Sequence, residues 1–302
     1  RRPDGYVGKP AEAGTDVFAM DTGNGSTDGP AFDSGFPVDM GLRRLPATGN
    51  DGTPSTDWAT YTRLLGGVFL RTNTTAATQS STRAKWDYMT GFNHTDDSTF
   101  QAWMWKRGAG FDVVTYDGNG STKTVSHSLG RVPEMIWIKA RNDAQNWLAY
   151  HKGLNGGTTP WNYHIMLNSD AAESAYSFIN QPTTTAFTVT SGWQASSKNY
   201  IALLFASVEG ISKCGYYDGS NSSQTITLGF QPRFIIIKLV NAAQGNWVVS
   251  DSLRGWDKYL HLNSNSTQDT FTIGTPTSTG FTLVSDYNTN QSGKRYIYYA
   301  HA

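Results

Sequence analysis

Two stretches of this chain carry one repeated pattern, and the repeat decides the fold. Residues 110–122 read GFDVVTYDGNGST, and residues 210–222 read GISKCGYYDGSNS. Farther along, residues 129–139 (LGRVPEMIWIK) match residues 228–238 (LGFQPRFIIIK). Because self-similarity at a fixed spacing is the mark of tandem structural units, we expect one fold to occur at least twice in these residues.

A third, more divergent copy precedes these two and begins at residues 16–27 (DVFAMDTGNGST). The copies share a Pro followed six residues later by a basic residue, an Asn at intervals of 95 residues, and a Trp. These markers are Pro37 with Arg43, Pro133 with Lys139 and Pro232 with Lys238; Asn73, Asn168 and Asn263; and Trp58, Trp147 and Trp247. We therefore predict repeats at 15–109, 110–209 and 210–302, after an N-terminal arm at 1–14 that continues from an upstream region.

Each copy contains short runs of β-branched and aromatic residues between clusters of Gly, Asn, Asp and Pro, as strands and turns do. Residues 235–237 (III) are apolar at consecutive positions, which predicts a strand covered on both faces. Residues 117–120 (DGNG) predict a hairpin turn, because Gly and Asn accept positive φ. The chain is therefore predicted to be all-β, with three tandem antiparallel repeats of about 95 residues that resemble a β-sandwich or jelly roll.

The composition supports a β-rich fold and excludes several functions. Charged residues make up 16% of the chain, whereas ordinary soluble domains have about 25%. The 24 basic residues balance 24 acidic ones, and this neutrality argues against a nucleic-acid partner, which requires a basic surface. Since no apolar run approaches the roughly 20 residues that span a bilayer, we expect no membrane insertion.

No motif predicts catalysis, a metal site or a cofactor. Cys214 is the single cysteine, which excludes a disulfide framework and a cysteine zinc site within one chain. The six histidines lack the i, i+4 spacing of zincins, and there is no Gly-x-Ser-x-Gly motif. A glycosidase needs two carboxylates across a cleft, but the adjacent Asp96 and Asp97 indicate a solvated loop. We therefore predict a protein that is not an enzyme, with no catalytic residues, no metal and no cofactor.

Three of the ten tryptophans are candidates for ligand binding. The tryptophans that recur in all copies are predicted to pack in the core, because a recurring position must satisfy the same contacts three times. Trp161, Trp193 and Trp256 do not recur and lie on segments that differ between copies. Aromatic side chains on such loops bind sugars and protein partners. The alternative, local packing of each ring over its own loop, stays open.

Several stretches together resemble a known family. They are residues 110–116 with GNGST after them, 132–139 (VPEMIWIK), 203–213 (LLFASVEGISK) and 296–300 (YIYYA). The chain resembles an uncharacterised repeat domain of predicted tail-fibre and other structural proteins of marine bacteriophages, over residues 15–302 and most strongly from 98 onward. The resemblance implies a virion protein and brings no catalytic residues. The first copy departs most, with GLRR at 41–44 in place of an apolar run before Lys.

We therefore expect a non-enzymatic structural or adhesion module of a virion, in a tail fibre or another surface appendage that contacts the host. The alternative is a carbohydrate-binding lectin module of a larger protein. A capsule-degrading tail spike is less favoured, because such spikes commonly use β-helices of short coils. The receptor and the attachment to head or tail stay open.

The expected partners are other virion proteins, a host surface glycan or protein, and further copies of the chain. The resemblance to fibres favours a homotrimer. A chain that works outside the cell without disulfides also needs stability from another source, and burial between subunits can supply it.

Overall fold

The computed structural model describes residues 12–47, 56–82, 84–92 and 95–302, and it confirms the predicted all-β fold. Strands account for 41% of the chain and helical segments for 5%, so strand pairing dominates the architecture. The helical segments are short 3-10 turns: η1 (Gly14–Asp16), η2 (Arg63–Leu65), η3 (Leu154–Gly157) and η4 (Pro160–Asn162). Residues 1–11, which form most of the predicted N-terminal arm, lie outside the described residues.

Residues 15–109, 110–209 and 210–302, called units 1, 2 and 3 below, each contribute one large antiparallel sheet. In unit 1 the strand order is β1 (Phe18–Thr22), β8 (Gln101–Trp105), β3 (Met40–Arg44), β4 (Ala59–Thr62), β5 (Val68–Arg71) and β6 (Gln79–Ser80). In unit 2 it is β9 (Phe111–Asp117), β15 (Asn199–Phe205), β11 (Met135–Ala140), β12 (Leu148–His151) and β13 (Ile165–Met166). In unit 3 it is β16 (Ser212–Asp218), β24 (Arg295–His301), β18 (Phe234–Leu239), β19 (Trp247–Asp251), β20 (Lys258–His261) and β21 (Asp269–Thr270).

Each unit also has a smaller antiparallel sheet. Unit 1 pairs β2 (Phe32–Asp33) with β7 (Gly91–Phe92), and unit 2 pairs β10 (Lys123–Ser126) with β14 (Ala186–Val189). Unit 3 pairs β17 (Gln224–Thr227) with β23 (Gly280–Leu283), which also pairs with β22 (Gly274–Thr277). In every large sheet the first strand of the unit lies beside its last strand, so the three strand orders correspond. That one ancestral unit was duplicated, and that the boundaries fall where the sequence indicates, stay predictions.

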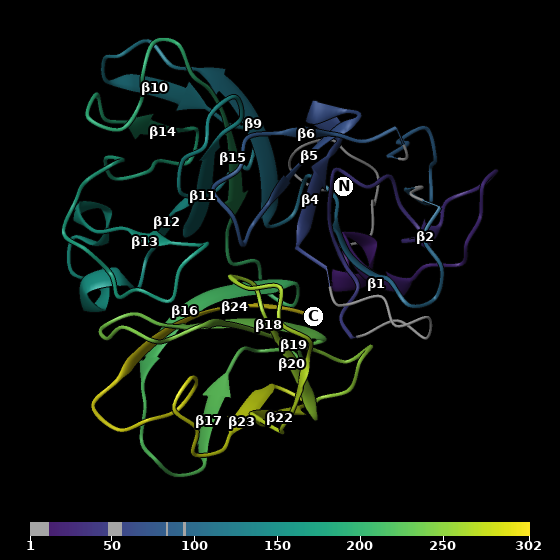
Figure 1. The fold of residues 1–302 in the computed structure, drawn as a ribbon. Coiled ribbons are helices and arrows are strands. Elements are labelled where there is room, and N and C mark those ends of the chain that lie inside the picture. The colour runs from purple at the N-terminus through teal and green to yellow at the C-terminus, as the bar shows by residue number, and fades with distance from the viewer. Residues whose placement is uncertain (1–11, 48–55, 83, 93–94) are drawn as a thin grey trace, which may run out of the picture.

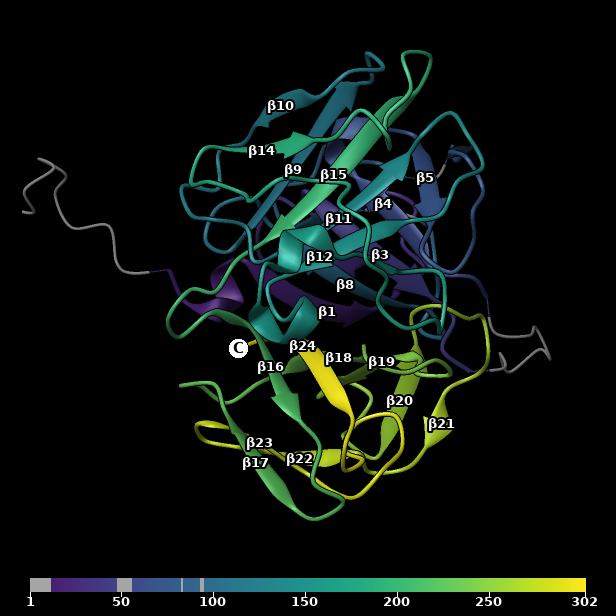
Figure 2. The same ribbon diagram turned by 90° about the vertical axis from the view of Figure 1, so that its left-hand side faces the viewer.

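The large sheets pack around a common centre, as Figures 1 and 2 show. Alternate residues of β11 explain how one strand serves two cores. Trp137 faces a cluster that all three units share, whereas Ile136 and Ile138 face the outer core of unit 2 beneath β10 and β14. In β18, Ile236 faces the shared cluster and its neighbours face the outer core of unit 3, which confirms the prediction that both faces of this strand are covered.

Strand register corrects the alignment of the basic residues. The fifth residue of β3, β11 and β18 is Arg44, Lys139 and Lys238, respectively. Arg44 is therefore the structural equivalent of the two lysines, and the sequence expectation of Arg43 was off by one residue. Arg43 instead forms an ion pair with Asp96, in the acidic pair that the sequence placed in a solvated loop, and Asp96 is only 3% exposed.

The predicted hairpin at residues 117–120 is wrong. β9 and β10, which flank this segment, do not pair with each other, because β9 pairs with β15 and β10 pairs with β14. The segment carries the chain from the large sheet to the small one. Gly118 is needed there because a Cβ atom at this position would lie 2.1 Å from the carbonyl oxygen of Ala195.

Candidate ligand-binding pocket

Each unit sends its recurring tryptophan into a neighbouring unit. The indole Nε1 donates to a main-chain carbonyl there: Trp58 to His261 (2.8 Å), Trp147 to Arg71 (2.8 Å) and Trp247 to Met166 (3.0 Å). Unit 1 thus bonds to unit 3, unit 3 to unit 2 and unit 2 to unit 1, which closes a ring of three junctions. All three side chains are at most 1% exposed, so their predicted place in the core is confirmed.

A second set of bonds follows the same ring. The backbone N–H groups of Thr78, Glu173 and Gln268 donate to carbonyls of Arg141, Val240 and Pro46, over 2.7 to 2.8 Å. The donors are again 95 residues apart. Because the same two bonds recur at every junction, these recurring residues form scaffold between units.

A buried cation stands near each junction. Lys238 is fully buried, and its Nζ donates to the carbonyl oxygens of Asp170 (3.4 Å) and Ala171 (3.0 Å) in unit 2. Desolvation lowers the pKa of Lys238 to about 7 and that of Lys139 to about 8. Both lysine ammonium groups donate to main-chain carbonyl oxygens. The equivalent Arg44 likewise donates to a main-chain carbonyl of unit 3. These three cations therefore stabilise the loops whose main-chain carbonyl groups they bind.

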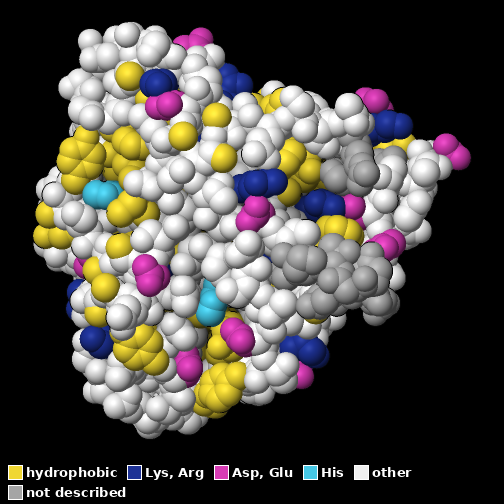
Figure 3. Space-filling view, in the orientation of Figure 1, with side chains coloured by type: hydrophobic (Ala, Val, Ile, Leu, Met, Phe, Trp, Pro, Cys, Tyr) yellow, Lys and Arg dark blue, Asp and Glu magenta, His cyan; other side chains and the backbone are white. Residues whose placement is uncertain are grey.

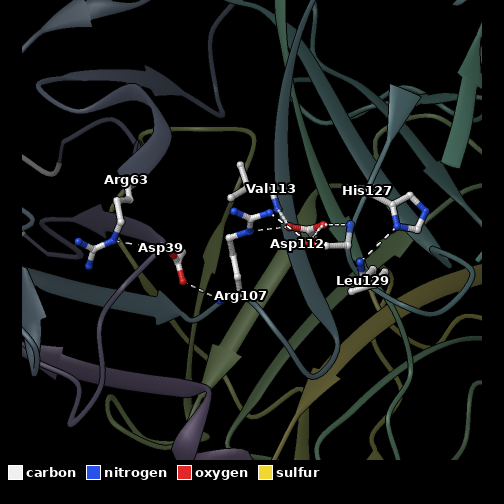
Figure 4. Close-up of polar contacts among 8 residues, drawn as sticks. Asp39, Arg63, Arg107, Asp112, Val113, His127 and Leu129 are labelled. Atoms are coloured by element: carbon white, nitrogen blue, oxygen red, sulfur yellow. Dashed lines mark hydrogen bonds and ion pairs between the residues drawn. The ribbon is translucent and has the colours of Figure 1, made fainter. Parts of the chain in front are cut away.

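Figure 4 shows a network of charged groups between units 1 and 2. The Arg107 side chain donates to Asp112 (2.6 Å), and the Arg107 backbone N–H donates to Asp39 (2.8 Å). Asp112 also accepts bonds from Ser128 and from the Val113 backbone, and it is 1% exposed. Both carboxylates are thus engaged with donors. The network has the form of a structural brace and not of a free acid and base pair across a cleft.

The structure separates the three candidate tryptophans. Trp161, in η4, is half-buried and packs against the outer core of unit 2. Trp256 packs against the outer core of unit 3, where the gap beside it has a volume of only about 10 Å³. These two rings therefore match the alternative of local packing. Trp193 also contacts the outer core of unit 2, but it lines a pocket of about 500 Å³.

The pocket lies mainly in unit 2 and is completed by Thr75 of unit 1. One part of its wall is aromatic, with Trp193, Tyr176 and His164. The rings of His164 and Tyr176 meet edge to face with centroids 5.7 Å apart. On this side of the molecule, where β12 to β14 lie, Figure 3 shows hydrophobic side chains gathered around a histidine. Such a surface offers flat apolar contact with polar edges.

The remainder of the wall mixes polar and apolar side chains and carries no charge. Gln145 and Asn146 line it, together with the apolar side chains of Leu148 and Met166. Burial lowers the pKa of His164 from its ordinary value of 6.5, so the imidazole is neutral at pH 7. Among the described residues, no Asp, Glu, Lys or Arg lines the pocket.

Three side-chain atoms of the pocket residues are buried without a hydrogen-bond partner: Gln145 Oε1, His164 Nδ1 and Trp193 Nε1. A buried polar group without a partner is costly, so these three atoms call for an explanation. The sequence indicated Trp193 but missed the others. None of Gln145, His164 and Tyr176 belongs to a sequence motif that indicates a ligand.

In the part of the chain that the structure describes, no group of three or more His, Cys, Asp or Glu side chains is placed to hold a metal ion. No helix in the described ranges has the length and apolar character to cross a membrane.

The fold and the pocket define an all-β protein whose three large sheets surround one core, with an uncharged, partly aromatic pocket at a junction between units. The chain belongs to the family described as a domain of unknown function, DUF7483, which matches residues 66–302. The match begins inside unit 1 and includes all of units 2 and 3. No curated protein and no solved structure matches the chain.

Proposed function

We propose that this chain is a non-enzymatic structural and adhesion module of a virion, in a tail fibre or another appendage that contacts the host. The observation that supports this proposal best is the apolar cluster shared by all three units, which includes Trp58, Trp147 and Trp247. Because protein interiors pack densely, such a cluster makes three units into one rigid body. A rigid body with variable loops on its surface suits the presentation of a contact site.

The proposed partners are other virion proteins, further copies of the chain and a host surface glycan or protein. The homotrimer rests on the resemblance to fibre proteins alone. The apolar cluster within the chain is a second source of the stability for which subunit contacts were expected.

The experiment is to locate the chain and to measure its attachment. Antibody against the purified chain should label an appendage in electron micrographs of the particles that carry it, and the purified chain should bind host cells. Labelling of the particle interior alone, with no binding to cells, contradicts the proposal. Incubation with host polysaccharide should release no reducing ends, and their release contradicts the non-enzymatic assignment.

A lectin module is the second candidate, and the pocket beside Trp193 is the observation that favours it.

A further inference from the structure

We propose that the pocket beside Trp193 binds a neutral sugar residue, which stacks on the indole and hydrogen-bonds to the side chains around it. The inference deepens the proposed adhesion function and rests on it, because it names the ligand class at one surface site. The pocket has a volume of about 500 Å³, which lies within the range of small-ligand pockets, about 300 to 1,000 Å³.

The charge of the wall selects a neutral ligand. No acidic or basic side chain among the described residues lines the pocket, and His164 is neutral. Asp143, the nearest charged residue in sequence to the lining residues Ala144 and Gln145, is paired with Lys198 at 2.7 Å. A carboxylated or phosphorylated ligand would lose its hydration here without gaining an opposite charge. Neutral hydroxyl and amide groups avoid this cost.

The indole of Trp193 is held in place before any ligand arrives. Phe178 meets it edge to face at 6.5 Å, and Tyr200 lies against it at 6.2 Å. Gly192 lets Tyr176 approach, because a Cβ atom at Gly192 would lie 2.9 Å from the Tyr176 hydroxyl. Tyr176 remains 40% exposed. A fixed aromatic face with a second aromatic side chain beside it loses little entropy on binding.

The unpartnered atoms of Gln145, His164 and Trp193 determine which hydrogen-bonding groups a ligand of this site must offer. They comprise a carbonyl-type acceptor, an imidazole nitrogen and an indole donor. All three atoms are shielded from solvent, so on binding the side chains that cover them rotate while the Trp193 ring stays in place. A polyhydroxylated ring both donates and accepts through each hydroxyl group, and it therefore matches this mixed set of atoms. A purely apolar ligand would leave all three unsatisfied.

Unit 3 provides a matched comparison. β14 of unit 2 ends at Val189 and β23 of unit 3 ends at Leu283, so Trp193 and Tyr287 each follow by four residues (193 − 189 and 287 − 283). Tyr287 donates its hydroxyl to the Ala243 carbonyl at 3.1 Å. The hydroxyl is thus already satisfied within unit 3, whereas Trp193 Nε1 has no partner. Tyr287→Ala is therefore the control for Trp193→Ala.

The test uses the full chain and the methyl glycosides of glucose, galactose, mannose and N-acetylglucosamine, with glucuronate and N-acetylneuraminate as charged probes. Binding is measured by ligand-observed NMR and tryptophan fluorescence. We expect at least one neutral glycoside to bind better than both charged probes. Trp193→Ala should lower its affinity at least about tenfold, the loss typical of a central aromatic contact, and Tyr287→Ala should leave it within about twofold.

Thr75→Trp provides a second variant in case Trp193→Ala disturbs folding. Thr75 is exposed and lies on unit 1, so the larger side chain occupies the pocket without removing a core contact. It should lower affinity to a similar extent while the melting temperature stays unchanged. Unchanged affinity in this folded variant refutes the site.

Other outcomes are equally informative. Preferential binding of a charged probe, or no binding of any neutral glycoside at concentrations on the order of 10 mM, refutes the ligand class. Host-cell binding that survives both Trp193→Ala and Thr75→Trp preserves the adhesion function and removes the sugar pocket from it. Sugar binding without cell or particle attachment refutes the adhesion function and keeps the pocket.

Discussion

At the scale of single residues, one Asn and one Trp explain how each unit is joined to the next. Asn168 Oδ1 accepts a bond from the backbone N–H of Trp147 at 2.9 Å, and its amide donates to Asn146. The same arrangement occurs at Asn73 and Asn263. The Asn fixes the backbone from which the Trp side chain reaches across the junction.

Replacement of Trp147 by Ala should destabilise the protein by about 3–5 kcal/mol, as truncation of a buried large side chain does. The ring is completely buried and bonded to Arg71 of unit 1. Urea unfolding measures the loss. Trp193→Ala is the comparison and should cost less, because its ring is only half-buried. Equal losses of unfolding free energy in the two variants would contradict the assignment of Trp147 to the scaffold and Trp193 to the pocket.

His151 should make stability depend on pH. It is completely buried, and its Nδ1 accepts a hydrogen bond from the Gly153 N–H. Its Nε2 therefore donates to the main-chain carbonyl oxygen of Tyr298 in unit 3 at 3.1 Å. Desolvation lowers its pKa to about 3 in the folded state, against about 6.5 when unfolded. Below pH 6.5 the unfolded state therefore binds more protons. The free energy of unfolding therefore has its full value above this pH and falls by about 1.4 kcal/mol per pH unit below it.

Urea midpoints at pH 7, 6 and 5 measure this dependence. His151→Gln keeps an acceptor and a donor but does not titrate, so it should show a shallower decline. His301, whose pKa burial also lowers to about 3, accounts for part of the slope that remains. An identical decline in the parent and the variant would contradict the assignment to His151.

At the scale of elements, much of the fold could be predicted and the pocket could not. Runs such as 235–237 gave strands correctly, because burial on both faces leaves consecutive apolar residues. The turn at 117–120 was misassigned because glycine has two uses, positive φ and close approach, which look the same in a sequence. The pocket combines residues that lie far apart in the chain, Thr75, Gln145 and Trp193, and no local pattern encodes such a meeting.

Gly118→Ala should therefore destabilise the protein by about 1–3 kcal/mol through steric overlap. The added Cβ would lie 2.1 Å from the Ala195 carbonyl oxygen, and neither backbone can move without disturbing β9 or β15. Gly29→Ala is the control, since its nearest neighbour would lie at 3.4 Å, an ordinary contact. Thermal melts of both variants measure the difference. An unchanged melting temperature for Gly118→Ala would show that the segment between β9 and β10 can move to admit the Cβ atom.

At the scale of the whole molecule, three units share one interior. The central cluster contains side chains from every large sheet, for example Trp105 of unit 1, Phe205 of unit 2 and Tyr299 of unit 3. Trp105 meets Phe205 edge to face at 6.5 Å and donates to the Tyr299 hydroxyl at 3.4 Å. A unit that opened alone would expose the inner face of its own sheet and the faces of both neighbours.

We therefore expect the chain to unfold in one cooperative transition. Calorimetry should give a calorimetric enthalpy equal to the van't Hoff enthalpy, as two-state unfolding requires. Three independent units would instead unfold separately, each with a smaller van't Hoff enthalpy. Trp147→Ala makes the test stringent, since it removes the indole bond at the junction between units 1 and 2. If the ring of junctions couples the units, the whole transition should move to lower temperature and stay single. An early transition that accounts for about a third of the enthalpy would show that unit 2 unfolds by itself and that the shared core does not make the chain one body.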